Sequence, residues 1–114
     1  MTFIAVAMSR VETIAKAVAD YYDVPLALLL GPSRLMRTTR VRFVAIYVTR
    51  KVTDYPLFQI GLFFNRDHTS ILNACQRIEM LMKTDAELAA QVRLLVQRFA
   101  PREFDENLDP VGHA

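Results

Sequence analysis

The sequence predicts an all-α fold, and two observations support that prediction. Apolar residues recur at helical spacing along most of the chain, and capping residues and prolines separate the repeats. Glycine is scarce, at 3 of 114 residues, which argues against a β-rich protein because tight hairpins usually need glycine. A hydrophobic content of 53% excludes a disordered chain. We expect one helical domain over residues 1–100, followed by an acidic, flexible tail over 101–114.

The first expected helix begins at a capping box, in which Ser9 is the N-cap and Glu12 reaches back to it. Asp23-Val24-Pro25 breaks that helix. Pro25 suits the first turn of a short helix over Leu26–Leu30. Gly31 is expected to close this helix in the left-handed conformation.

A basic loop over residues 33–36 leads to the third expected helix. Thr38 or Thr39 can cap this helix, which should run to about Asp54. Its β-branched content is high for a helix, so the prediction depends on the period and length of the apolar pattern. The apolar stripe consists of Val41, Val44, Ala45, Val48 and Val52.

The centre of the chain predicts two helices joined by a tight turn. Pro56 opens a short helix over 57–62, and Asp67 is a good N-cap for a longer helix over 68–83. The longer helix has an apolar core face and an opposite, hydrogen-bonding face. The core face carries Ile71, Ala74, Cys75, Ile78 and Met82, and the polar face carries Thr69, Asn73, Gln76 and Arg77. This pattern describes a helix-turn-helix, whose second helix approaches base edges with small polar residues.

A last helix is expected to follow a second capping box, formed by Thr84 and Glu87. It should run to about Phe99, because Pro101 stops it.

Charge is unevenly distributed, although the net charge is only +2. Six basic residues and no acid lie between Asp23 and Asp54, whereas one base and four acids lie over residues 102–109. A concentrated basic segment favours binding to a polyanion such as DNA or RNA. The alternative interpretation is that these residues form a solvated helix face. The six basic residues are Arg34, Arg37, Arg40, Arg42, Arg50 and Lys51.

Catalysis and metal binding find little support in the sequence. The single cysteine, Cys75, lies on an apolar helix face and is expected to be a buried, inert thiol. His68 has no nucleophile or metal partner in its sequence neighbourhood, and His113 lies in the acidic tail. The apolar residues 1–8 lack the basic region of a signal peptide, and this run is too short to span a bilayer. We therefore expect a cytoplasmic, nucleoid-associated protein that is not an enzyme and needs no cofactor or metal.

The ordered set of motifs resembles the C-terminal DNA-binding domain of bacterial DnaA, the chromosomal replication initiator. The resemblance is carried by residues 57–61, by the run Arg66-Asp67-His68-Thr69-Ser70 with residues 71–75, and by residues 77–79. Upstream support comes from residues 18–22, 29–31, 33–34, 40–42 and 45–47. The match extends over roughly residues 11–99. It implies a compact, Trp-repressor-like helical fold that binds a short A·T-rich box in duplex DNA.

The resemblance also implies roles for individual residues. Arg34 corresponds to the basic-loop arginine that enters the minor groove, and Arg42 to an arginine at the base of that loop. Leu57 corresponds to an apolar residue that touches thymine methyls. The expected base or groove contacts come from Arg34, Arg42, Leu57, Asp67, His68, Thr69, Ser70 and Asn73. The expected phosphate contacts come from Arg37, Arg40, Arg50, Lys51 and Arg66, which position the protein without specifying sequence.

Three residues depart from the family pattern. Phe43 replaces a frequent glutamine, Phe58 replaces a frequent proline, and Asn65 stands where the family usually has two glycines. These departures concern the identity of the recognised box.

A further departure concerns the initiator's ATPase. The initiator's phosphate loop, G-x-x-x-x-G-K-[ST], has no counterpart, because the glycines are Gly31, Gly61 and Gly112. We expect a stand-alone relative without the ATPase domain, which regulates replication initiation or transcription by binding DnaA-box-like sites.

The alternative function is that of a protein-interaction module on an inherited helix-turn-helix scaffold. Phe43 and Phe58 could form its partner surface if they are exposed. The expected partner is duplex DNA, with other replication or regulatory proteins as further candidates. The sequence leaves the oligomeric state open.

Overall fold

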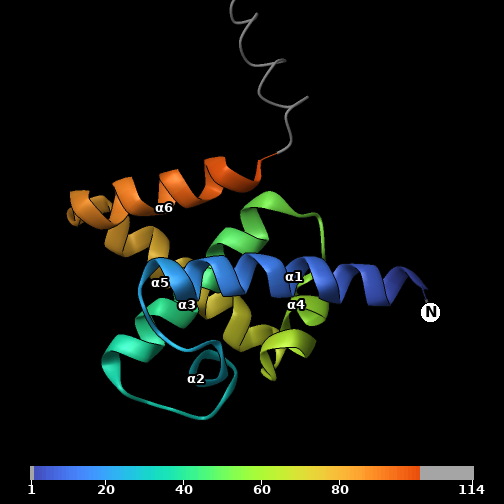
Figure 1. Cartoon of the computed structure of the whole chain (residues 1–114). Helices are drawn as coiled ribbons and strands as arrows, with labels where there is room; N and C mark the ends of the chain where they lie inside the picture. Colours follow the sequence, from blue (N-terminus) through green and yellow to red (C-terminus); the bar gives the residue numbers. More distant parts are fainter. Residues whose placement is uncertain (1, 101–114) are drawn as a thin grey trace, which may run out of the picture.

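Six α-helices make up the part of the chain that the computed structural model describes, residues 2–100 (Figure 1). They are α1 (Thr2–Tyr21), α2 (Leu26–Leu30), α3 (Met36–Val52), α4 (Leu57–Phe64), α5 (His68–Thr84) and α6 (Ala86–Phe99). No strand occurs within residues 2–100, so the all-α prediction is confirmed. The acidic tail over 101–114, for which we predicted flexibility, lies outside the described residues.

Helix α3 is the centre of the fold, because it contacts all five other helices. The predicted apolar stripe is confirmed, since each of its members is buried. Burial extends to neighbouring positions such as Ile46 and Thr49, so α3 is enclosed on most of its sides. This packing outweighs the modest helix propensity of its β-branched residues.

The predicted capping box at Ser9 is wrong. Helix α1 begins at Thr2, and Ser9 lies inside it, where its carbonyl oxygen accepts a hydrogen bond from Thr13 Oγ1 at 3.0 Å. An N-cap residue must have non-helical dihedrals, and Ser9 does not. The apolar N-terminal residues continue the helical pattern instead, and Ala7 is buried against the rest of the protein.

The entry into α3 also differs from the prediction. Gly31 is extended, with φ −91° and ψ −172°, and is not left-handed. Helix α3 begins at Met36 after Leu35, so neither Thr38 nor Thr39 caps it. Thr38 is buried in the first turn. No side chain caps α3, and the preceding loop is held by tertiary hydrogen bonds from Arg42 and Arg66.

The helix-turn-helix is formed by α4 and α5, as predicted. Helix α4 continues two residues beyond the expected end, to Phe64. The predicted Asp67 cap is confirmed. The second capping box was misplaced by one residue, because Asp85 caps α6 by accepting from the backbone N–H of Leu88 at 3.0 Å. Thr84 is instead the last residue of α5.

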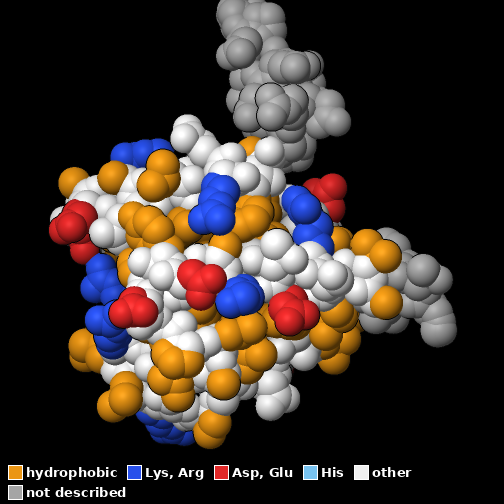
Figure 2. Space-filling model, in the orientation of Figure 1, with side chains coloured by type: hydrophobic (Ala, Val, Ile, Leu, Met, Phe, Trp, Pro, Cys, Tyr) orange, Lys and Arg blue, Asp and Glu red, His pale blue; other side chains and the backbone are white. Residues whose placement is uncertain are grey.

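The face of the molecule that carries α1 is not a basic surface. Figure 2 shows acidic and basic side chains side by side along this helix. One such pair is Lys16 and Asp20, whose charged atoms lie 3.5 Å apart. Exposed pairs of this kind contribute little to stability. The base-contacting residues expected from the resemblance lie elsewhere, as Arg34 lies in the loop between α2 and α3 and Thr69 in the first turn of α5.

Candidate nucleic-acid interface

The first turn of α5 presents short polar side chains. Asp67 precedes the helix in an extended conformation, and its Oδ1 accepts a hydrogen bond from the backbone N–H of Ser70 at 2.8 Å. This backbone hydrogen bond lowers the pKa of Asp67 below its usual value, because it stabilises the carboxylate. His68, Thr69 and Ser70 are exposed, as is Asn73 one turn later. The cap thus fixes the helix start that displays these side chains.

The turn between α4 and α5 depends on Gly61 and Asn65. A Cβ atom on Gly61 would lie 2.3 Å from the backbone oxygen of Arg66, so only glycine allows this close approach. Asn65 has φ 60° and ψ 43°, a left-handed conformation that asparagine tolerates. The backbone N–H of Arg66 donates to the carbonyl oxygen of Gly61 at 2.9 Å. Asn65 therefore closes the turn at the place where the resemblance suggested two glycines.

The basic loop predicted over residues 33–36 extends over residues 31–35 in the structure, and the name refers to this range from here on. Arg42 is buried at its base. Only 4% of its surface is exposed. Its Nε donates to the carbonyl oxygen of Leu29 at 2.7 Å, and its Nη2 lies 3.1–3.3 Å from the carbonyl oxygens of Leu28, Gly31 and Ser33. Burial lowers the pKa of Arg42, and the nearby Arg66 cation lowers it further. Its guanidinium shapes the basic loop. Because the Arg42 side chain also lines the hollow beside that loop, its expected contact with DNA stays a prediction.

Arg66 is half-buried, and its guanidinium is bonded to backbone oxygens. Its Nη1 donates to the carbonyl oxygen of Phe64 at 2.7 Å, and its Nη2 donates to that of Gly31 at 2.8 Å. We expected a phosphate contact from this residue. The structure places both terminal nitrogens on carbonyl oxygens, so the side chain links the turn of the helix-turn-helix to the basic loop.

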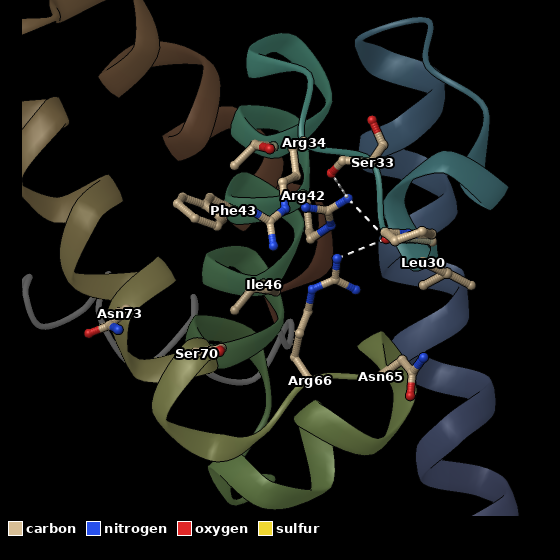
Figure 3. Close-up of a pocket in the computed structure, with 13 residues that line it drawn as sticks. Leu30, Ser33, Arg34, Arg42, Phe43, Ile46, Asn65, Arg66, Ser70 and Asn73 are labelled. Atoms are coloured by element: carbon tan, nitrogen blue, oxygen red, sulfur yellow. Dashed lines mark hydrogen bonds between the residues drawn. The ribbon is translucent and has the colours of Figure 1, made fainter.

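A groove of about 780 Å³ separates the basic loop from α5. Arg34 and Ser33 line it on the loop side, and Ser70 and Asn73 line it on the α5 side (Figure 3). Arg34 is exposed and forms no hydrogen bond or ion pair within residues 2–100. The structure therefore brings the predicted loop arginine and part of the predicted recognition surface to opposite walls of one groove.

Apolar side chains also reach this surface. Phe43 is half-buried and lines the groove from α3, whereas Leu57 is half-buried and packs against the core. Phe58 is 64% exposed. Arg77 lines a neighbouring hollow together with Phe43 and Asn73. The sequence places Arg77 on the polar face of α5, but the resemblance assigns it no contact with DNA.

The remaining basic residues do not all share this groove. Arg40 forms an ion pair with Asp85 at 2.7 Å, and Arg37 donates to the carbonyl oxygen of Tyr22. Both line a separate hollow between α3 and α6. Arg50 and Lys51 are exposed at the C-terminal end of α3, where the Lys51 ammonium lies 5.4 Å from the centre of the Tyr47 ring. The basic stretch in the sequence is therefore divided between surfaces in the fold.

The described part of the chain offers little for metal or membrane binding. Within it, no three histidine, cysteine, aspartate or glutamate side chains come together as metal ligands. None of the described helices is both long enough and apolar enough to cross a membrane. Cys75 is buried, and burial raises the pKa of its thiol, as expected for an inert cysteine.

The capped helix start, the tight turn and the groove lined by arginine define a helix-turn-helix domain of the DNA-binding class. Residues 11–78 match the family model described as the bacterial dnaA protein helix-turn-helix. The chain belongs to this family.

Similar proteins in three bacteria carry the name chromosomal replication initiator protein DnaA. The chain is 41% identical over 86 residues to that of Cereibacter sphaeroides, a match that covers 75% of this chain and 19% of the relative. The match to the Ruegeria pomeroyi protein is also 41% identical, and covers 75% of this chain and 18% of the relative. The match to the Roseobacter denitrificans protein is 40% identical, and covers 75% and 19%. The chain thus spans about a fifth of the length of these relatives.

Proposed function

We propose that this protein binds duplex DNA in a sequence-specific manner at DnaA-box-like sites. In this role it regulates replication initiation or transcription without ATPase activity of its own. Family membership supports DNA binding. The name of the relatives, chromosomal replication initiator protein, motivates the choice of sites and process. On this proposal the protein acts on the nucleoid in the cytoplasm, and other replication or regulatory proteins are its further candidate partners.

The groove between the basic loop and α5 is the observation that carries the proposal. It places Arg34, an exposed arginine with no hydrogen bond or ion pair within residues 2–100, opposite small polar side chains at a capped helix start. A helix start of this kind enters the major groove, and an adjacent arginine suits a narrow A·T-rich minor groove because the negative potential is enhanced there. The two walls together fit a duplex that is read in both grooves.

Each proposed contact has a chemical reason. The methyl group of Thr69 and the side chain of Leu57 suit thymine methyls, and the Asp67 carboxylate suits the cytosine amino group. His68, Ser70 and Asn73 add hydrogen-bonding groups at the same surface. Arg50 and Lys51 are exposed and remain proposed phosphate contacts, whereas Arg37 and Arg40 could serve phosphates only from the α3–α6 side.

Fluorescence anisotropy tests the proposal directly. Two labelled duplexes are compared across a salt series, one with a DnaA-type A·T-rich box and one with the same bases scrambled. We expect tighter, salt-dependent binding to the box. Equal affinity for both duplexes would contradict sequence specificity, and no binding at low salt would contradict DNA binding itself.

Two variants assign the contacts to the two walls. Arg34→Ala and Thr69→Ala should each weaken binding to the box by roughly tenfold or more. Arg93→Ala removes an exposed arginine from α6 and is the matched control, which should bind as the unmodified protein does. Unchanged affinity of both groove variants would contradict the proposed interface.

The second candidate function is protein recognition on the same scaffold. Phe58 and Leu62 are 64% and 62% exposed, and they lie four residues apart on the outer face of α4. Exposed apolar side chains grouped in this way suit a protein partner. This candidate is favoured if a partner complex survives Arg34→Ala and is lost in Phe58→Ala.

A further inference from the structure

Two arginine side chains from different parts of the chain meet at one carbonyl oxygen. The backbone oxygen of Gly31 accepts from Arg66 Nη2 at 2.8 Å and from Arg42 Nη2 at 3.3 Å (Figure 3). Arg42 comes from α3, beside the basic loop, whereas Arg66 comes from the turn of the helix-turn-helix. The two walls of the groove are therefore joined at Gly31.

The Arg66 end of this connection is rigid. The backbone of Arg66 is held by its hydrogen bond to Gly61, in a turn whose close packing excludes a Cβ atom at that glycine. The Arg66 guanidinium is held by the carbonyl oxygen of Phe64, which belongs to the same turn. Because both the backbone and the Nη1 atom of Arg66 are fixed, its Nη2 atom can hold the Gly31 carbonyl oxygen at a set distance from the turn.

The basic loop has few other restraints on the side that faces the helix-turn-helix. The Arg66–Gly31 bond is the sole hydrogen bond between the loop and the helix-turn-helix within residues 2–100. Pro32, Arg34 and Leu35 are exposed. We propose that Arg66 is a positioning residue that fixes the basic loop at a set distance from the start of α5, so that Arg34 and the polar residues of α5 engage one duplex without reordering. The consequence for DNA rests on the proposed function.

The electrostatics of the connection fit this assignment. Neither Arg42 nor Arg66 forms an ion pair with a carboxylate within the described residues. Two like charges close together repel each other, so the pair is held by its carbonyl partners.

Hydrogen exchange in the free protein tests the positioning role independently of DNA. We expect Arg66→Ala to raise the exchange rates of the Gly31 and Leu35 amides by roughly tenfold, because the loop opens more often. The amide of Ser70, at the start of α5, should keep its rate if the domain stays folded.

Arg66→Lys should behave like Arg66→Ala, since a lysine cannot bind two carbonyl oxygens in the same forked geometry. Arg93→Ala is the charge-matched control. Unchanged loop exchange in a folded Arg66→Ala protein would overturn the proposal.

A double-mutant cycle tests the consequence for DNA. If Arg66 acts through the loop, most of the affinity lost in Arg66→Ala should disappear once Arg34 is already alanine. The loss should instead add to that of Thr69→Ala, and the salt dependence should be unchanged. An additive effect with Arg34→Ala, together with a salt slope reduced by about one, would identify a direct phosphate contact and overturn the positioning role. If the unmodified protein binds no DNA, the proposed function fails, and the exchange experiment alone decides the role of Arg66.

Discussion

The two walls of the groove are held in place in different ways. The start of α5 is held by local interactions: Asp67 accepts from an N–H three residues away, and the turn before it closes on Gly61. The basic loop has no regular structure and depends on the guanidinium of Arg42, which reaches carbonyl oxygens 9 to 14 residues earlier in the chain. Local bonds thus fix the wall with small polar groups, and long-range bonds fix the wall with the exposed arginine.

This difference shows how arginines with similar sequence surroundings acquire different roles. Arg34 and Arg42 both lie in the basic stretch, but one is exposed and the other is buried. A buried guanidinium can satisfy several backbone oxygens at once because it carries five N–H donors in a fixed fork. One arginine in this region therefore builds the loop, and another is exposed on the loop surface.

The largest effect is expected from a substitution in the turn that precedes α5, where local interactions hold the wall of the groove. In Gly61→Ala the new Cβ atom would lie 2.3 Å from the Arg66 oxygen, so the turn cannot close without backbone movement. We expect a loss of roughly 3 kcal/mol in the free energy of unfolding, measured by urea denaturation. Gly31→Ala is the matched control. Its nearest contact would be 3.3 Å and its φ is accessible to alanine, so its cost should stay below about 1 kcal/mol. Equal losses in the two variants would contradict this account.

The next largest effect is expected from a substitution that removes the long-range hydrogen bonds of the basic loop. Arg42→Ala leaves loop and α2 carbonyl oxygens without their donor, and we expect a loss of about 2 kcal/mol in the free energy of unfolding. Arg42→Lys should recover only part of it, because an ammonium lacks the forked geometry. Arg50→Ala, at an exposed position of the same helix, is the stability control and should change little. Unfolding curves that coincide for Arg42→Ala and the unmodified protein would show that the loop is held by other contacts.

A smaller effect concerns the local caps and appears as a pH dependence. The pKa of Asp67 is lowered first by the Ser70 N–H, and that of Asp85 first by the Leu88 N–H. A carboxyl whose pKa is lower in the folded state stabilises the protein above its unfolded pKa, and this contribution is lost as the pH falls through the folded value. The melting temperature should therefore decline below about pH 4. The double variant Asp67→Asn, Asp85→Asn should show a shallower decline, and parallel curves would contradict the assignment.

The smallest expected effect concerns the left-handed residue of the turn. Asn65→Gly should change the free energy of unfolding by less than about 0.5 kcal/mol, because both residues accept φ 60°. Asn65→Val should destabilise the protein more strongly, since a β-branched side chain is strained in this conformation. Thermal melts of the two variants separate backbone conformation from side-chain contacts. Equal melting temperatures for both would contradict a left-handed requirement at this position.

The parts of the fold that the sequence predicted depend on neighbouring residues. The Asp67 cap, the two faces of α5 and the apolar stripe of α3 follow from capping chemistry and helical periodicity, which operate within a few residues. The predicted Ser9 cap failed for a related reason. A capping motif is a local preference, and α1 continues past the serine to Thr2, with Ala7 buried one half-turn before Ser9.

The candidate site also combines features that depend on neighbouring residues with features that depend on distant ones. The sequence alone predicted the helix-turn-helix, the exposed polar start of α5 and the arginine-rich loop. Tertiary structure alone decided that Arg42 and Arg66 hold the loop and that Arg40 pairs with Asp85 away from the groove. The Arg66 guanidinium finds its partner 35 positions away in the chain. No local pattern encodes such a contact, because the partner is a backbone oxygen, which every residue carries, and only the folded chain determines which one lies within reach.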